Sequence, residues 1–330
     1  MRLSLFPLML LFAPLAAQDA PSRRPVHTYS IVAVDSATGE IGVAVQSHWF
    51  SVGSVVTWAE PGVGAVATQS FVQPSYGPQG LYLMKTGTPA PEALAALLRA
   101  DPDSQVRQVA MIDARGRVAA HTGSRDIPAA GHIVGNRFSV QANLMRNDAV
   151  WPAMARAFES STGDLAERMI NALDAAEAAG GDIRGKQSAA LVVVSGDPNE
   201  PSWNRVFDLR VEDHPNPLDE LRRLMRVARA YKAATDGDNF VAAGQIDRAL
   251  ESYREASEIL PDSATNGELI YWVAVTLADL GRVDEAIPLF ARSFEQDPSW
   301  RELTTRLPAV GLLRADEATI DRILREAGRD

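Results

Sequence analysis

The segment Thr28-Tyr-Ser-Ile-Val-Ala-Val-Asp35 is followed, after a short turn, by Glu40-Ile-Gly-Val-Ala-Val-Gln-Ser47. Both segments are rich in valine and isoleucine, whose β-branched side chains favour strands. Turn-forming residues, including Gly39, separate the two segments. We therefore expect strands over 28–34 and 40–47 that can pair with each other, with Thr28 opening the first strand.

Strand and helix signals continue to about residue 211. Further strands are expected over 54–59, 63–70, 107–113, 117–122, 137–144, 188–194 and 207–211. Helices are expected over 80–85, 91–99, 149–160 and 165–179. Strands and helices occur in blocks rather than in strict alternation, which favours α+β layers over a doubly wound parallel sheet. Two packed antiparallel sheets with helices outside fit this order.

The last hundred residues carry a different pattern, with small and aromatic residues at tetratricopeptide offsets. The first set is Gly237, Phe240, Ala249, Tyr253, Ala256 and Pro261, and the second is Ala274, Leu277, Ala286, Phe290, Ser293 and Pro298. Small residues let paired helices approach, and aromatic residues fill the groove between them. We expect two repeats, a capping helical pair over 301–313 and 316–327, and a bridging helix over 215–230.

The N-terminus resembles a secretory signal peptide. A basic start at Arg2 precedes an apolar run that ends in small residues at Ala17. No other stretch approaches the ~18 consecutive apolar residues of a transmembrane helix. We therefore expect a protein without membrane insertion that is exported to the periplasm or secreted, with a signal peptide over 1–17 and an exposed arm over 18–27.

Charge and cysteine content narrow the range of functions. Residues 231–330 contain 11 basic and 19 acidic side chains, a net charge of −8, and residues 18–230 carry only −3. An acidic balance argues against nucleic acid as a partner. The chain has no cysteine, which excludes disulfides, thiol nucleophiles and thiolate metal sites. Two domains of different character are expected, over 28–230 and 231–330.

The first domain contains a set of distinctive motifs, which are Thr28-Tyr-Ser-Ile-Val-Ala33, Ala44-Val-Gln-Ser47, Trp58 to Ser70, Pro74-Ser-Tyr-Gly77, Ala120-His-Thr-Gly123, Gly180 to Ala190 and Asp208 to Pro215. Together they resemble an uncharacterised bacterial family, a domain of unknown function placed in the N-terminal-nucleophile (Ntn) hydrolase superfamily. The resemblance covers roughly residues 27–225. It implies a four-layer αββα sandwich, followed here by the all-α repeat domain.

The resemblance also implies a mechanism, with Thr28 as nucleophile and its own α-amino group as general base. Members of the family can begin Met-Thr, so that removal of methionine frees the threonine. Here the ten residues Gln18–His27 would still precede Thr28 after signal cleavage. Either a second, autocatalytic cut separates His27 from Thr28, or Thr28 is an ordinary strand residue.

Other candidate site residues lie near strand ends. Ser47 could orient the amine of Thr28, and Gln46 could bind substrate, although a strand-end pair that caps a turn is the plainer interpretation. Asn143 could donate a hydrogen bond to a developing oxyanion, or simply serve a strand edge. We therefore take Thr28, Ser47 and Asn143 as the catalytic candidates.

A glycine-flanked loop supplies the remaining candidates for substrate binding, which are Asp182, Arg184, Gln187 and Ser188. An arginine there could bind a carboxylate with both guanidinium nitrogens. The alternative is a helix end capped by Gly180 with a solvated turn. The run Gly180-x-x-x-x-Gly185-Lys186 imitates a phosphate-binding loop, but it follows a helix and ends in Gln187, so nucleotide binding is rejected.

Metal and cofactor signals are weak. The five histidines form no helical pair with metal-ligand spacing, and no Gly-x-Ser-x-Gly elbow is present. No cofactor is therefore expected. The first hypothesis is an exported Ntn-type amidohydrolase for a small amide or peptide. The second is a non-catalytic Ntn-fold binding protein whose repeats hold a peptide or protein; assembly into a homo-oligomer is left open.

Overall fold

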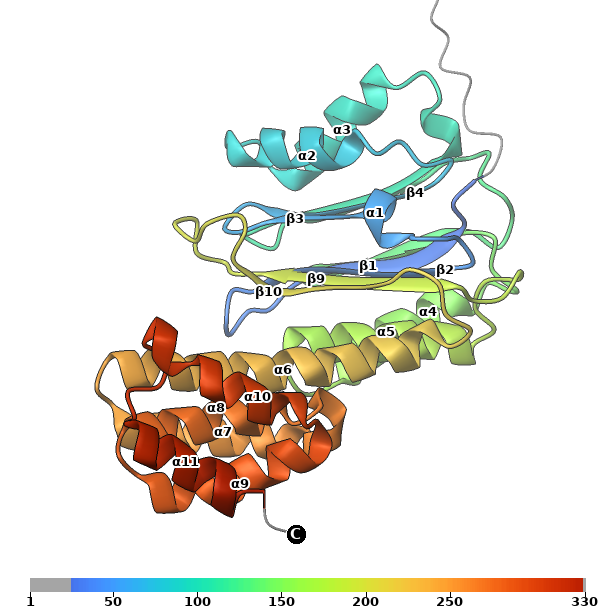
Figure 1. Ribbon diagram of the computed structural model, residues 1–330. Coiled ribbons are helices and arrows are strands. Elements are labelled where there is room, and N and C mark those ends of the chain that lie inside the picture. Colours follow the sequence, from blue (N-terminus) through green and yellow to red (C-terminus); the bar gives the residue numbers. More distant parts are fainter. Residues whose placement is uncertain (1–24, 329–330) are drawn as a thin grey trace, which may run out of the picture.

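A computed structural model describes residues 25–328 of the chain (Figure 1). The expected signal peptide and residues 18–24 of the expected arm lie outside this range. The described chain forms two β-sheets with flanking helices, followed by a stack of helices. No helix within residues 25–328 is long and apolar enough to cross a membrane.

Two antiparallel sheets form the first domain. The six-stranded sheet has the order β10-β9-β2-β1-β8-β7, with β1 Thr28–Val34, β2 Ile41–Ser47, β7 Gly131–Gly135, β8 Phe138–Ala142, β9 Ser188–Val194 and β10 Arg205–Val211. The four-stranded sheet has the order β3-β4-β5-β6, with β3 Thr57–Glu60, β4 Gly64–Ser70, β5 Arg107–Asp113 and β6 Val118–Thr122. The predicted pairing of the first two strands is confirmed, with Thr28 opposite Ser47.

The two sheets pack face to face between helices (Figure 1). The helices α2 Tyr76–Lys85 and α3 Ala90–Ala100 cover the four-stranded sheet, while α4 Val150–Ser160 and α5 Leu165–Ala178 cover the six-stranded sheet. A short 3-10 helix, η1 Ser104–Val106, leads into β5. This arrangement confirms the expected mixture of α and β structure with antiparallel sheets.

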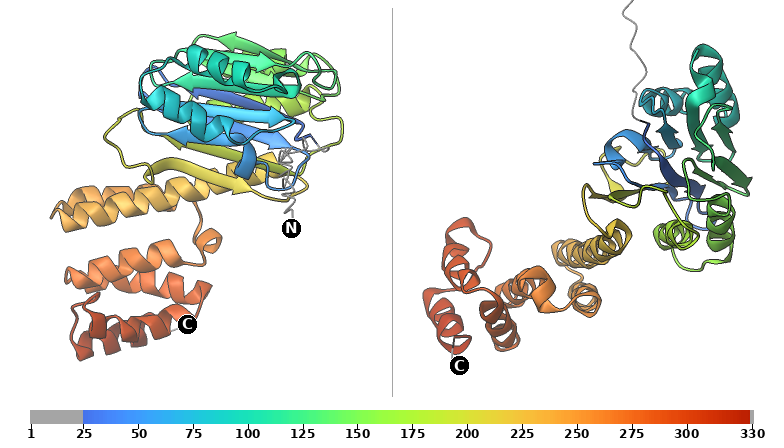
Figure 2. Two further views of the ribbon diagram at one scale, coloured as in Figure 1. Left: turned by 90° about the horizontal axis from the view of Figure 1, so that it is seen from above. Right: turned by 90° about the vertical axis from the view of Figure 1, so that its right-hand side faces the viewer.

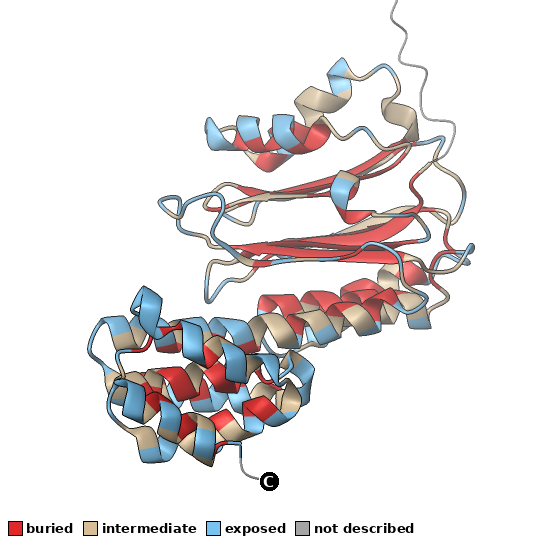
Figure 3. Ribbon diagram, in the orientation of Figure 1, coloured by how far each residue is buried: buried red, intermediate tan, exposed pale blue. Residues whose placement is uncertain are grey.

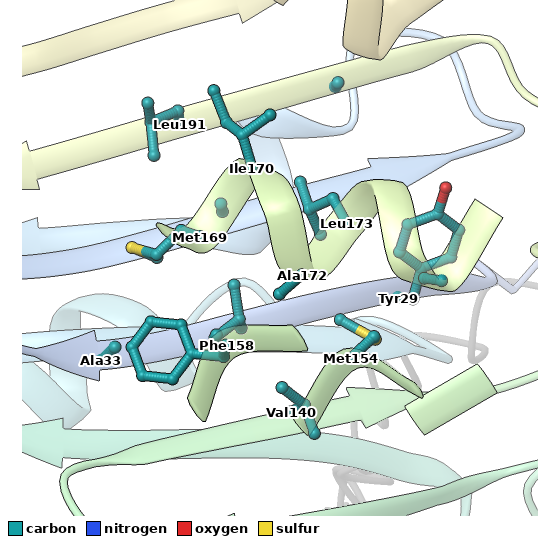
Figure 4. Close-up of a cluster of buried hydrophobic side chains, with 14 of the residues drawn as sticks. Tyr29, Ala33, Val140, Met154, Phe158, Met169, Ile170, Ala172, Leu173 and Leu191 are labelled. Carbon is teal, nitrogen blue, oxygen red and sulfur yellow. The ribbon is translucent and has the colours of Figure 1, made fainter. Parts of the chain in front are cut away.

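Alternation along β1 divides its side chains between the two cores. Val32 and Val34 lie between the sheets, in one cluster with residues of β4 and β5. Tyr29, Ile31 and Ala33 face the opposite way and pack against α4 and α5; Figure 4 shows this side of the sheet. Every residue of β1 is therefore buried, as Figure 3 also shows for most of the central strands.

Helix α5 shows how local sequence sets an element. The N-cap residue before it is Asp164, whose side chain accepts a hydrogen bond from the backbone N–H of Glu167, as is typical at the start of a helix. Its apolar face includes Met169, Ile170 and Leu173, which pack on the six-stranded sheet (Figure 4).

Helix α6, Pro217–Ala242, belongs to both domains. Leu218 and Leu221 in its first half join the core beneath the six-stranded sheet. Ala230 and Ala233 in its second half pack with residues of the next helix. The bridging helix expected over 215–230 thus continues into the first repeat, and the expected domain boundary after residue 230 falls inside it.

The C-terminal region is entirely helical and extends away from the sandwich (Figure 2). Its elements are α7 Ile246–Ile259, η2 Asp262–Thr265, α8 Glu268–Asp279, α9 Val283–Gln296, α10 Ser299–Arg306, η3 Pro308–Val310 and α11 Glu317–Glu326. Gly237 lies against the ring of Tyr253, where an added Cβ would stand 2.4 Å from a ring carbon. The close approach of paired helices that the repeat pattern predicts is confirmed.

Two local expectations are wrong. The sequence predicts a strand over residues 54–56, but Gly53–Val56 forms the one-turn helix α1. The helical turn places both Val52 and Val56 in the core between the sheets. Strand β7 was not expected at all. Its residues are only half-buried at the edge of the six-stranded sheet, and it has glycine at both ends, so the sequence carries little strand signal.

Candidate active site

Thr28 lies at the first position of β1, on the face between the sheets, and its side chain is fully buried. Its hydroxyl donates a hydrogen bond to the carbonyl oxygen of Val26, at 2.9 Å. Its own carbonyl oxygen accepts from the backbone N–H of Asn143 at 3.1 Å and from Nε2 of Gln69 at 3.2 Å. These contacts hold both the hydroxyl and the carbonyl group of Thr28 in place.

Two donors converge on the carbonyl oxygen of the residue before Thr28. The hydroxyl of Ser47 donates to the carbonyl oxygen of His27, and Nη2 of Arg184 donates to the same atom at 3.0 Å. Arg184 is held by Asp182, whose carboxylate is fully buried and accepts from both Nε and Nη2. The carbonyl of the His27–Thr28 peptide bond therefore faces one hydroxyl and one guanidinium.

The side chain of His27 is also buried, and its Nδ1 lies 3.0 Å from Oδ1 of Asn143. Burial lowers the pKa of His27 below its usual range, and the nearby positive charge of Arg184 acts in the same direction. The lowered pKa favours the neutral imidazole at this position. Asn143 is predicted to donate to an oxyanion, but with His27 in place its Oδ1 contacts the imidazole instead.

Behind Asn143, a network of buried amide side chains joins the two sheets. Oε1 of Gln108 accepts from Nδ2 of Asn143 at 2.8 Å and from Nε2 of Gln69 at 2.7 Å. Oε1 of Gln69 accepts from the hydroxyl of Ser30, which in turn accepts from Nε2 of Gln141. Each amide of this network thus has defined hydrogen-bond partners, and these bonds make the end of the sandwich near Thr28 polar and hold its side chains in place.

Gln69 and Gln108 were not among the predicted site residues. A signal was present, because both are polar residues at inward-facing positions of strands that are otherwise apolar on that face. Buried polar side chains need partners, so such positions indicate a built polar centre. The sequence of one strand does not identify which residue of the facing sheet supplies the hydrogen-bond partner.

The residues that precede Thr28 cover it. Val26 forms an antiparallel bridge with Ser70, with N–H to O distances of 2.6 and 2.9 Å. The hydroxyl of Ser70 donates to the carboxylate of Asp126, and burial raises the pKa of that carboxyl. Residues 26 and 27 are therefore a short extended segment packed over the Thr28 side chain, and no substrate can reach its hydroxyl in this form.

Three predicted site residues lie elsewhere. Gln46 points to the opposite face of the sheet, beneath α5, and within residues 25–328 neither its Oε1 nor its Nε2 has a hydrogen-bond partner. Gln187 donates to the carboxylate of Asp213 at the surface. Ser188 lies beside Ser47 in the ladder, but its hydroxyl accepts from the N–H of Val52 and donates to a neighbouring carbonyl. Ser188 thus anchors the loop after β2.

Within residues 25–328, no group of three acidic or histidine side chains is placed to hold a metal ion. His121 and His132 contact Ser104 and Thr122, respectively. Asp126, which lies between them in the sequence, accepts hydrogen bonds from the hydroxyl of Ser70 and the N–H of Gly123.

The architecture is that of a sandwich of two antiparallel sheets between helices, with a polar centre at the start of β1 and helical repeats appended. The model of a family of unknown function, DUF1028, matches residues 28–221, so the chain belongs to this family. The match begins at Thr28. A tetratricopeptide-repeat model matches residues 240–307.

A solved structure supports the same relationship. The chain is similar to the DUF1028 protein SPO2555 from Silicibacter pomeroyi, with a TM-score of 0.56 and 30% identity over 61% of this chain and 86% of the other. No curated protein matches the chain.

Proposed function

We propose that the protein is an exported Ntn-type amidohydrolase whose nucleophile is Thr28, freed by cleavage of the His27–Thr28 bond. One observation carries the proposal. The carbonyl oxygen of His27 receives hydrogen bonds from Ser47 and from the Arg184 guanidinium, next to a buried threonine hydroxyl. Donors aimed at a carbonyl oxygen stabilise the charge that develops when that carbonyl is attacked. Export rests on the signal-like segment that ends at Ala17.

The cleavage would be intramolecular. The Thr28 hydroxyl oxygen bonds to the carbonyl carbon of His27 through a five-membered ring, and the negative charge falls on the oxygen between Ser47 and Arg184. The carbon–nitrogen bond then breaks, and the hydroxyl proton ends on the Thr28 nitrogen, which leaves as an amine. Water hydrolyses the resulting ester, which releases the His27 carboxylate and restores the Thr28 hydroxyl. No metal or cofactor is needed for this balance.

The same groups would serve turnover of a separate substrate. The freed α-amino group of Thr28 takes the proton of its own hydroxyl, and the oxygen attacks an amide carbonyl. That carbonyl would occupy the place that His27 leaves, with its oxygen between Ser47 and Arg184. Asn143 then lies beside the new amine and the acyl group. A small amide or a peptide fits such a site.

A second function is favoured by another observation. In the described structure the nitrogen of Thr28 is part of the peptide bond to His27, and the residue is fully buried. This state suits a binding protein that has lost catalytic activity. The appended repeats would then hold a peptide or protein partner, and their net charge of −8 favours a basic segment.

Thr28 variants separate the two functions. Thr28→Ala should leave the chain uncleaved and without hydrolase activity, whereas Thr28→Ser should retain both to a reduced degree. Thr68→Ala is the matched control, since Thr68 is an equally buried threonine on β4 whose hydroxyl contacts Gln73. Full hydrolase activity in Thr28→Ala would overturn the proposed mechanism. Uncleaved wild-type protein that binds a partner would favour the second function.

A further inference from the structure

Val26 and His27 occupy the place that the acyl half of a substrate would take. We call this place the acyl-side subsite; it is bounded by Ser70, Asn143 and the pair Ser47 and Arg184. Val26 and His27 are almost fully buried in it. Cleavage before Thr28 would empty the subsite while leaving its walls, because these belong to β2, β4 and the segments after β8 and α5.

The wall that meets the His27 side chain accepts a hydrogen bond. Gln108 donates through Nε2 to the carbonyl oxygens of Ala142 and Gly131, so its Oε1 is the acceptor for Nδ2 of Asn143. Asn143 is therefore oriented with Oδ1 toward the imidazole. It follows that Nδ1 of His27 carries the hydrogen, and that the subsite fits a side chain that donates.

Charge restricts the side chain further. The guanidinium of Arg184 lies at the subsite, and the carboxylate of Asp182 is already engaged by that guanidinium. A cationic side chain would face Arg184 without a free carboxylate to pair with, and burial of an unpaired charge is costly. The fitting group is therefore neutral and about the size of an imidazole.

The backbone contacts define the rest of the ligand. Both the N–H and the carbonyl of Val26 pair with Ser70, at 2.6 and 2.9 Å. A ligand that reproduces these bonds must be an extended peptide, added as a short strand beside Ser70. A single acylated amide without a preceding residue would leave the polar backbone groups of Ser70 unpaired.

We propose that the acyl-side subsite takes an extended peptide whose carbonyl-donating residue carries a neutral, hydrogen-bond-donating side chain of imidazole size, with histidine as the best fit. The inference rests on the proposed function and narrows its substrate from any small amide to a peptide cleaved after such a residue. The amide orientation of Asn143 and the bridge at Ser70 carry it.

The direct test uses the wild-type protein as it is purified and three fluorogenic peptides. Acetyl-Pro-Val-His-aminomethylcoumarin should be cleaved with a kcat/KM about tenfold above that of the Phe analogue, the size expected for one satisfied hydrogen bond. It should also exceed acetyl-His-aminomethylcoumarin, which lacks the strand-like residue. Equal rates for the His and Phe peptides would overturn the inference while leaving the proposed hydrolase intact.

A second measurement needs no turnover. In a full-length Thr28→Ala chain, the N–H of Val26 should be protected from hydrogen exchange by its bond to Ser70. Adding His27→Leu should lower that protection about tenfold, whereas His27→Gln, which retains a neutral donor, should lower it less. If wild-type protein keeps Gln18 as its terminus and cleaves nothing, the proposed function falls. Unchanged protection in the His27→Leu variant would then show that the subsite does not select a donor.

Discussion

Replacement of Ser47 by alanine should slow cleavage of the His27–Thr28 bond without unfolding the protein. Ser47 supplies one of two hydrogen bonds to the His27 carbonyl oxygen, the other being the 3.0 Å bond from Arg184. Loss of one of two donors to a developing oxyanion costs about 2.7–4 kcal/mol of activation free energy, or roughly 100- to 1,000-fold in rate. The remaining guanidinium keeps the reaction measurable.

The effect on folding should be much smaller than the effect on rate. Ser47 is buried in β2 and makes one side-chain hydrogen bond as donor, which is worth about 1 kcal/mol in a typical protein. Ser139→Ala is the matched control, because Ser139 is a buried serine of the same sheet whose hydroxyl donates to Gln141. It loses a comparable bond but does not touch His27.

The assay is the rate at which chains that still carry His27 before Thr28 become chains that begin at Thr28. Intact mass follows both species in pulse-labelled, freshly synthesised protein, and urea titration of each variant reports its stability. We expect the Ser139→Ala chain to mature within about threefold of the wild-type rate, as for a substitution away from the reacting atoms. If Ser47→Ala matured as fast as Ser139→Ala, the two donors would have no catalytic role.

Three further predictions concern the buried polar groups. Gln46→Met should raise the free energy of unfolding by about 1–3 kcal/mol in urea titration, because neither polar atom of Gln46 has a hydrogen-bond partner in the part of the chain that the structure describes; a loss of stability would contradict this reasoning. Gln108→Leu should lower it by about 3–5 kcal/mol, since the amides of Gln69 and Asn143 both lose their acceptor; a near-neutral effect would contradict the network. In a Thr28→Ala chain, the folded-state pKa of His27 is lowered by burial, so the unfolded chain binds the proton more readily. The stability contributed by His27 should be complete above the unfolded pKa of about 6.5 and should be lost as pH falls through the lower folded pKa. Adding His27→Gln should flatten that part of the pH–stability curve, and parallel curves for the two chains would refute the assignment.

Much of the fold follows from local pattern. The β-branched segments before and after Gly39 predict the central pair of strands, and the spacing of Gly237 and Tyr253 predicts the helical repeats. Strand β7 is not predicted from the sequence, because a half-exposed edge strand does not need a strong apolar pattern. The one-turn helix at Gly53–Val56 is not predicted either, because packing between the sheets overrides the strand preference of valine.

The candidate site was predictable only in part. Five of the predicted residues lie around the His27–Thr28 bond: Thr28, Ser47, Asn143, Asp182 and Arg184. Gln46 could have been separated from Ser47 by sequence alone, because neighbours in a strand face opposite ways and only one can share the face of Thr28.

The remaining site features required three dimensions. The role of Arg184 depends on Asp182, which orients its guanidinium, and on β1, which presents the carbonyl of His27. The amide network joins residues of both sheets, including Gln69 and Gln108, and no spacing along one chain reveals that contact. The occupation of the subsite by His27 itself depends on the path of the segment before β1.

The central claim is that Thr28 becomes the first residue of the working protein. Intact mass and N-terminal sequencing of the wild-type protein, recovered from the cells that produce it and from their medium, test it most directly. The account predicts a chain that begins at Thr28, produced from a precursor in which Thr28→Ala blocks the conversion. A stable wild-type chain that still carries Val26 and His27 would contradict it, because the threonine would lack the free amine that its chemistry requires.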